Sequence, residues 1–166
     1  MFPSVKSVKM SVTSDLRAGM MSWNSVAAGS IVVMLTYFTI DNHVDLYPWN
    51  NLVSPQLPST LVAAIPFGFY AAAFARGRRW MMIVGTVHSY VWLALQIRQW
   101  WIPYLFGSTW LHSDFEWYFA HGYDRTISML SRIGDRPVPD AQHLVLQALS
   151  LFVVIATTAA VISHRS

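Results

Sequence analysis

Residues 59–106 read STLVAAIPFGFYAAAFA-RGRR-WMMIVGTVHSYVWLALQIRQWWIPYLF, and this stretch decides the fold. Two apolar segments, residues 59–75 and 80–106, flank a turn of four residues that holds three arginines. The core of a bilayer is about 30 Å thick, and a helix of about 20 residues crosses it. The first segment is close to that length and the second exceeds it. Because the turn is so short, we expect a hairpin of two membrane-spanning helices.

Two further apolar stretches, residues 18–40 and 143–163, are also long enough to cross a bilayer. The first is longer than the apolar part of a signal peptide, and no small-x-small cleavage site follows it before Asp41, so we expect it to be retained. Of the 166 residues, 54% are hydrophobic and only 11% are charged. So few charges cannot cover the surface of a soluble domain. The sequence therefore predicts an all-α integral membrane protein, a single four-transmembrane-helix bundle.

The charged residues predict how the bundle is oriented. Seven of the eleven basic residues lie in the N-terminal segment, in the turn before residue 80 and at the C-terminus, and the positive-inside rule places them in the cytoplasm. Seven of the eight acidic residues lie in the other two connections, residues 41–58 and 107–142. We therefore expect cytoplasmic N and C termini, two extracytoplasmic loops, and a multi-pass protein of the plasma (inner) membrane. The seven basic residues are Lys6, Lys9, Arg17, Arg76, Arg78, Arg79 and Arg165.

The larger extracytoplasmic loop, residues 107–142, is predicted to contain a helix of its own. Over residues 115–130 the apolar side chains recur at helical spacing, and Trp117, His121 and Asp124 fall on the opposite face. An amphipathic helix of this kind lies along the membrane surface or covers the end of a bundle.

A polar stripe runs along the span of residues 80–106. His88, Trp92 and Gln96 are spaced four residues apart, so they share one helical face, which we expect to point into the bundle. An ionisable residue at membrane depth is a candidate for function, whereas hydrogen bonding between helices is the alternative for a glutamine. Arg98 is expected near the extracytoplasmic interface. We interpret the stripe as the floor of a substrate-binding pocket to which Trp117 also contributes.

Histidines and carboxylates gather on the extracytoplasmic side, where four of the six histidines are expected. Together these groups can form acid/base pairs or hold a divalent metal. Neither an HExxH motif nor an EF-hand spacing is present, so a metal site in this cluster is the weaker alternative and no cofactor is predicted. Asp140 follows Pro139 directly before the last span and is predicted to cap that helix. The candidate catalytic residues are Glu116, His121, Asp124, Arg98 and His143.

Other residues limit or extend this interpretation. The chain has no cysteine, which excludes thiol redox chemistry and thiolate metal sites. Most of the eight tryptophans are expected in interfacial belts. Two segments, residues 45–51 (DLYPWNN) and 98–104 (RQWWIPY), are distinctive but indicate no activity by themselves.

These features favour a membrane protein with an outward-facing polar and aromatic pocket. We expect it to bind or convert a lipophilic, lipid-like or isoprenoid-like substrate by non-redox acid/base chemistry, as an isomerase, cyclase or hydrolase. A transporter or channel subunit is one alternative, although no span carries a central carboxylate or lysine. A scaffold or accessory subunit is another. Expected partners are membrane lipid, a lipophilic small molecule and a homo-oligomer or larger membrane complex; nucleic acid is not expected, because the basic residues form no aromatic-interleaved stripe.

Overall fold

The computed structural model describes residues 22–52, 54–109 and 115–164. Every regular element within these ranges is a helix. Four helical stretches are long and apolar enough to cross a membrane: α2 (Trp23–His43), α3 (Leu57–Ala75), the continuous run Arg79–Phe106, and α7 (Ala141–Ser163). The prediction of an all-helical membrane protein with four spans is therefore confirmed.

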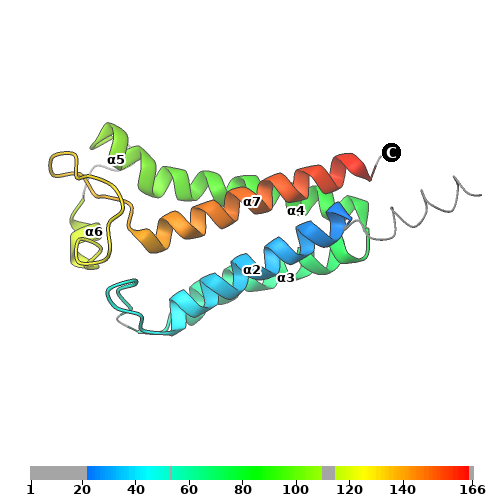
Figure 1. Ribbon diagram of the computed structural model, residues 1–166, viewed down its shortest axis with the longest axis horizontal. Helices are drawn as coiled ribbons and strands as arrows, with labels where there is room; N and C mark the ends of the chain where they lie inside the picture. Colours follow the sequence, from blue (N-terminus) through cyan, green and yellow to red (C-terminus); the bar gives the residue numbers. More distant parts are fainter. Residues whose placement is uncertain (1–21, 53, 110–114, 165–166) are drawn as a thin grey trace, which may run out of the picture.

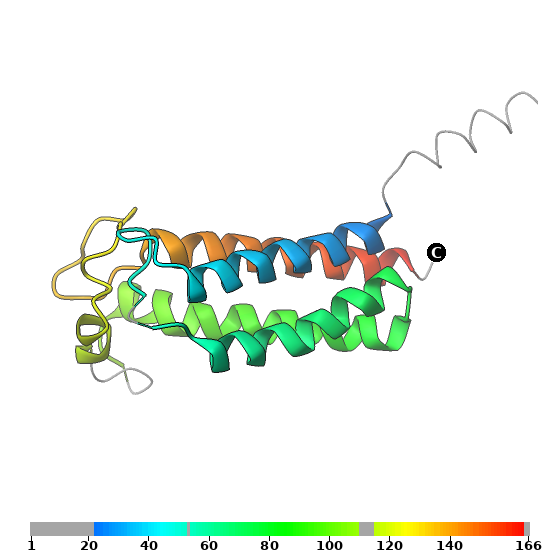
Figure 2. The same cartoon turned by 90° about the horizontal axis from the view of Figure 1, so that it is seen from below.

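Neighbouring spans run antiparallel and form an up-down-up-down bundle (Figures 1 and 2). Helix α2 packs against α3 and α7, and α4 (Arg79–Gln96) packs against the same two helices from the other side. The α3–α4 turn and the C-terminal end of α7 lie at one end of the bundle, which we call the turn end (Figure 1). The described residues of the connections 44–56 and 107–140 lie at the opposite end, which we call the loop end (Figure 1).

The bundle buries polar hydroxyls and exposes apolar side chains. Ser89, Ser150 and Thr157 are almost fully buried, and each hydroxyl donates to a backbone carbonyl of its own helix. These bonds satisfy the hydroxyls without water, as the interior of a membrane requires. Large apolar side chains on all four spans face outward instead, and Val62 (73% exposed) and Phe152 (50%) are examples. An exposed apolar surface of this extent fits a surrounding of lipid rather than water.

The third span is not one regular helix. It consists of α4, the π-helix η1 (Ile97–Trp101) and α5 (Ile102–Phe106). Pro103 has no N–H and therefore cannot donate a hydrogen bond to the preceding turn. The hydroxyl of Tyr118, from the connection beyond the third span, donates to the backbone carbonyl of Gln99 in η1. A turn of π-helix of this kind is frequent at functional sites.

Helix α2 extends one turn further than the sequence analysis predicted. It ends at His43 rather than at residue 40, because Asn50 satisfies its last carbonyls: the side-chain amide donates to the carbonyls of Asp41 and Val44 at 2.9 and 2.8 Å. Asp41 therefore belongs to the helix and not to the loop. Helix α7 likewise begins at Ala141, two residues before the predicted start.

The helix predicted over residues 115–130 is found only as α6 (Glu116–Ala120). Gly122 ends it, because this residue has a φ of 70°, which side chains other than glycine rarely adopt. A Cβ at this position would also lie 2.4 Å from Nδ2 of Asn51. Residues 123–130 therefore continue as a turn followed by irregular chain, and His121 and Asp124 do not share a helix face.

Gly85 in α4 allows close packing against α3, and its replacement tests that packing. A Cβ at Gly85 would lie 2.9 Å from Cγ of Tyr70. Overpacking of this kind costs about 1–3 kcal/mol. We therefore expect G85A, purified in mild detergent, to denature at a lower temperature than the unsubstituted protein.

The matched control is G29A, because a Cβ at Gly29 would meet nothing within 4 Å. Alanine is also the better helix former, by about 1 kcal/mol, so G29A should keep or raise the denaturation temperature. Equal temperatures for the two variants would contradict the close α3–α4 packing.

Candidate functional site

A cavity of about 330 Å³ opens at the loop end, between the ends of α2 and α7 and the two connections. Its size is in the lower range of small-molecule pockets. The wall combines carboxylate, imidazole, amide and apolar groups. The lining residues on which the argument depends are Phe38, Asp41, Asn51, His121, Tyr123, His143 and Leu146.

The distinctive segment 45–51 forms one wall of the site. Asn50 is 2% exposed, and its Oδ1 accepts from the backbone N–H of Leu46 at 2.9 Å while its Nδ2 donates to the end of α2. The next residue, Asn51, donates to the backbone carbonyl of His121 in the larger loop. The segment is therefore bonded both to α2 and to the second connection.

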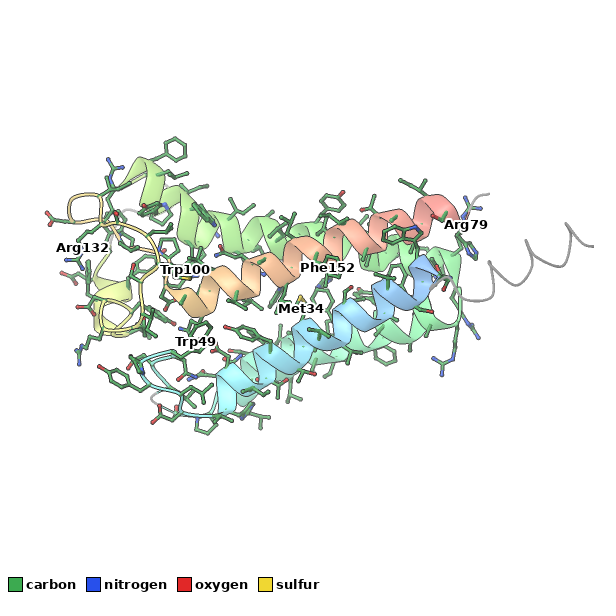
Figure 3. All side chains as sticks on the ribbon, viewed as in Figure 1. Met34, Trp49, Arg79, Trp100, Arg132 and Phe152 are labelled. Carbon is green, nitrogen blue, oxygen red and sulfur yellow. The ribbon has the colours of Figure 1, made fainter. Side chains whose placement is uncertain are left out.

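Trp49 and Tyr37 connect this segment to α7. The indole N–H of Trp49 donates to the hydroxyl of Tyr37 at 3.2 Å, and that hydroxyl donates to the backbone carbonyl of Gln142 at 2.9 Å. Figure 3 shows Trp49 between the 44–56 connection and the start of α7. The N–H of Ile127 also bonds to the carbonyl of Pro48 at 3.0 Å, which joins the two connections directly.

Asp140 is the buried centre of these contacts. It is 0% exposed, and its carboxylate accepts from the backbone N–H and Nδ1 of His143, from Oγ1 of Thr126 and from Nε2 of Gln142, at 2.6–3.1 Å. These bonds occupy the capacity of a carboxylate. The backbone bond caps α7, so the predicted role of Asp140 as an N-cap is confirmed.

His143 is held in a fixed orientation within the cavity wall. Its Nδ1 lies 2.6 Å from Oδ1 of Asp140, and its ring lies 4.0 Å, between centroids, from the ring of Trp100 in η1. The adjacent Trp101 donates to Oε1 of Gln147 on α7 at 2.7 Å, which fixes η1 against the same helix. When Nδ1 donates to this carboxylate, the neutral form of the ring carries its lone pair on Nε2. This arrangement is typical of a general base positioned by an acid.

Asp41 differs from Asp140 in one decisive respect. It lies in the last turn of α2, partly buried in the cavity wall, and interacts electrostatically with His143 and Asp140. Its Oδ1 is buried and has no hydrogen-bond partner in the described part of the chain. Burial of a polar atom without a partner is costly, so such an atom requires an explanation. The position of Asp41 in the cavity wall suggests that a ligand is the missing partner of this atom.

Two tyrosines near the site remain protonated at neutral pH. Burial, together with the nearby negative charges of Asp140 and Asp41, raises the pKa of Tyr123 to about 12. Burial also raises the pKa of Tyr118 to about 12, although the positive charge of Arg98 opposes that shift. Tyr123 therefore presents a neutral phenol to the cavity.

Three of the predicted catalytic residues lie outside this cavity wall. Glu116 is exposed at the start of α6, and Arg98 is exposed in η1. Asp124 lines a separate cavity of about 180 Å³ that also includes Arg132. Of the predicted set, the structure brings His121 and His143 together in one wall. Trp117 belongs to α6, and its side chain lies outside the described residues.

The predicted pocket floor lies deeper and is packed. Trp92 and Gln96 both donate to Oγ of Ser150 on α7, at 3.2 and 2.9 Å. Ser150 is seven residues beyond His143, about 10 Å further along the helix. His88 packs against the rings of Phe67 and Tyr70, with centroids 5.0 and 5.4 Å away. The stripe points into the bundle as expected, but its contacts are those of helix packing rather than of the cavity wall.

Asp41, Asn51 and Tyr123 were not among the predicted site residues. Asp41 was assigned to a loop, and its spacing of four from Tyr37 indicates a shared face only once α2 is known to continue to His43. The side chains described here include no group of three histidines or carboxylates that could hold a metal ion. His112 and Asp114, which belong to the predicted cluster, lie outside the described residues.

The fold and the site define a small four-span membrane protein with a carboxylate–histidine cavity at one end of its bundle. Comparison with known protein families, with curated proteins and with solved structures finds no match to the chain. The chemistry of the site therefore carries the functional argument.

The two carboxylates should respond in opposite ways to the same substitution. D140N removes acceptors from a fully bonded network, and hydrogen bonds to a charged group contribute about 1.5–3 kcal/mol each. We expect a clear decrease in the denaturation temperature in detergent. D41N removes the charge of a partly buried carboxylate whose Oδ1 has no hydrogen-bond partner among the described residues, so its denaturation temperature should stay the same or rise.

D135N is the control, because Asp135 is exposed in a turn at the same end. It should leave the denaturation temperature unchanged. If D41N destabilises the protein as much as D140N does, Asp41 is structural and the distinction between the two carboxylates fails.

Proposed function

We propose that this protein binds a lipophilic molecule at the loop end and converts it by non-redox acid/base chemistry. The buried Oδ1 of Asp41, without a protein partner among the described residues, carries the proposal. The proposal places the loop end on the extracytoplasmic side of the plasma membrane, which the distribution of basic residues supports.

The distribution of groups in the cavity wall favours an amphipathic ligand. Phe38 and Leu146 line the wall about one helical turn deeper than Asp41 and His143. Asn51 and His121 line it from the connections. A ligand with a polar group at the level of the two titratable side chains and an apolar part toward the helices would complement this wall.

The acid/base chemistry would use His143 and Asp41 as a pair. Nε2 of His143 is available to accept a proton, and Asp140 stabilises the ring when it becomes charged. In an isomerisation, one member of the pair removes a proton from the ligand and the other supplies a proton at a second position, so no electron acceptor is needed. In a hydrolysis, the base would take a proton from water as the water oxygen bonds to the ligand, and the other member of the pair would protonate the group that leaves when the ligand bond breaks. Asp140 is a positioning residue, because it acts through His143.

This assignment is narrower than the sequence prediction. Glu116, Asp124 and Arg98 do not line the cavity, and His88, Trp92 and Gln96 belong to the packed interior. His121 and His143 remain from the predicted set. Asp41 and Tyr123 are added, the second as a neutral phenol that can hydrogen-bond a ligand oxygen.

Ligand retention and solvent label uptake test the two parts of the proposal. Protein is purified in mild detergent from membranes incubated in D₂O containing H₂¹⁸O, and the co-purifying small molecules are analysed by mass spectrometry. We expect one lipophilic species in near-stoichiometric amount, labelled with deuterium or ¹⁸O. D41N should reduce its retention by roughly tenfold, as expected for loss of a charged hydrogen bond.

H143Q separates binding from conversion. It should retain the ligand but abolish the uptake of label, whereas D135N should match the unsubstituted protein in both respects. Identical extracts from the unsubstituted protein and D41N, including extracts in which neither holds a ligand, would contradict binding. A retained ligand that takes up no label would contradict conversion.

A further inference from the structure

A second feature lies at the turn end, far from the loop-end cavity. A cavity of about 200 Å³ occupies the groove between α3 and α4 next to their connecting turn. Phe69, Ala72, Ala73 and Met81 form its apolar lining, and Arg76 and Arg78 supply its charge. The two alanines matter because their small side chains leave the groove open on the α3 side.

The turn end carries a concentrated positive charge. Arg76, Arg78 and Arg79 fall within four residues. The acidic side chains within the described ranges all lie at the loop end, so none of them offsets the arginines. A guanidinium group carries five N–H donors in a planar arrangement that matches phosphate. Arg76 uses one nitrogen to donate to the carbonyl of Ala72 at 3.3 Å, which places its head group beside the groove.

The groove is also continuous with the apolar surface of the spans. Phe69 is 64% exposed and Trp80, which follows the turn, is 73% exposed. A molecule that reaches this groove from the bilayer keeps an apolar chain against the helices while its head group stays at the level of the arginines. A small soluble anion would make no use of the apolar lining.

We propose that this groove binds an anionic phospholipid. The phosphate would contact Arg76 and Arg78, and an acyl chain would pack on Phe69, Ala72 and Met81. Anionic lipids attract basic residues at a membrane surface, and the groove adds a shaped apolar contact to that attraction. This lipid site is independent of the function proposed for the loop end, because the two cavities have no lining residue in common.

Native mass spectrometry of the full chain in mild detergent tests the site. Phosphatidylglycerol and phosphatidylcholine with identical acyl chains serve as probes, and glycerol phosphate serves as the soluble head group. We expect phosphatidylglycerol to stay bound and to raise the denaturation temperature, while phosphatidylcholine does neither. The variant with R76Q and R78Q should retain phosphatidylglycerol roughly tenfold less well.

R79Q is the matched control, because Arg79 begins α4 at the turn end (Figure 3) and is not among the residues that line the groove. It should retain the lipid. A72F leaves every arginine in place and fills the groove, so it should also lose the lipid; this variant keeps the test valid if the double substitution prevents folding. Equal retention of the two phospholipids, equal loss in R79Q, or full competition by glycerol phosphate would each overturn the proposal.

Discussion

The hydrogen bonds of Asp140 are the interactions on which the loop end depends. One buried carboxylate caps α7, fixes the ring of His143 and accepts from Thr126 in the larger loop. Each of these bonds would be weak at an exposed surface, but burial makes their loss costly because the donors would then be left without acceptors. The start of a span, the orientation of a titratable ring and the path of a loop are thus set by the same side chain.

A second group of contacts joins the third span to the larger loop and to the start of α7. Pro103 cannot donate a hydrogen bond to the preceding turn of the third span, and the hydroxyl of Tyr118 donates to the carbonyl of Gln99 in η1. In the same region, η1 carries Trp100 against His143 and Trp101 against Gln147. The distinctive segments 45–51 and 98–104 therefore have a structural explanation. Segment 45–51 is linked to the start of α7 through Trp49 and Tyr37, and segment 98–104 contacts α7 through Trp100 and Trp101.

The sequence predicts the spans well because apolar length is a local property that needs no knowledge of contacts. It also predicts the cap at Asp140, since an acid after a proline and before an apolar run has few other roles. The cavity was harder to predict. Asp41 enters the site only because Asn50, nine residues away, prolongs α2, and the 115–130 helix stops early because Gly122 meets Asn51. Such effects arise from contacts between segments that are separate in the sequence, and the periodicity of apolar residues gives no information about these contacts.

The central claim is that Oδ1 of Asp41 and Nε2 of His143 contact a ligand in the loop-end cavity rather than other groups of the protein. An experimental structure of the protein purified directly from its membrane tests this claim most directly. The account predicts density for an elongated non-protein molecule in the loop-end cavity, with a polar atom within about 3.2 Å of Oδ1 of Asp41, the ordinary reach of a hydrogen bond. A cavity closed by protein side chains, with a protein donor bonded to that oxygen, would contradict it.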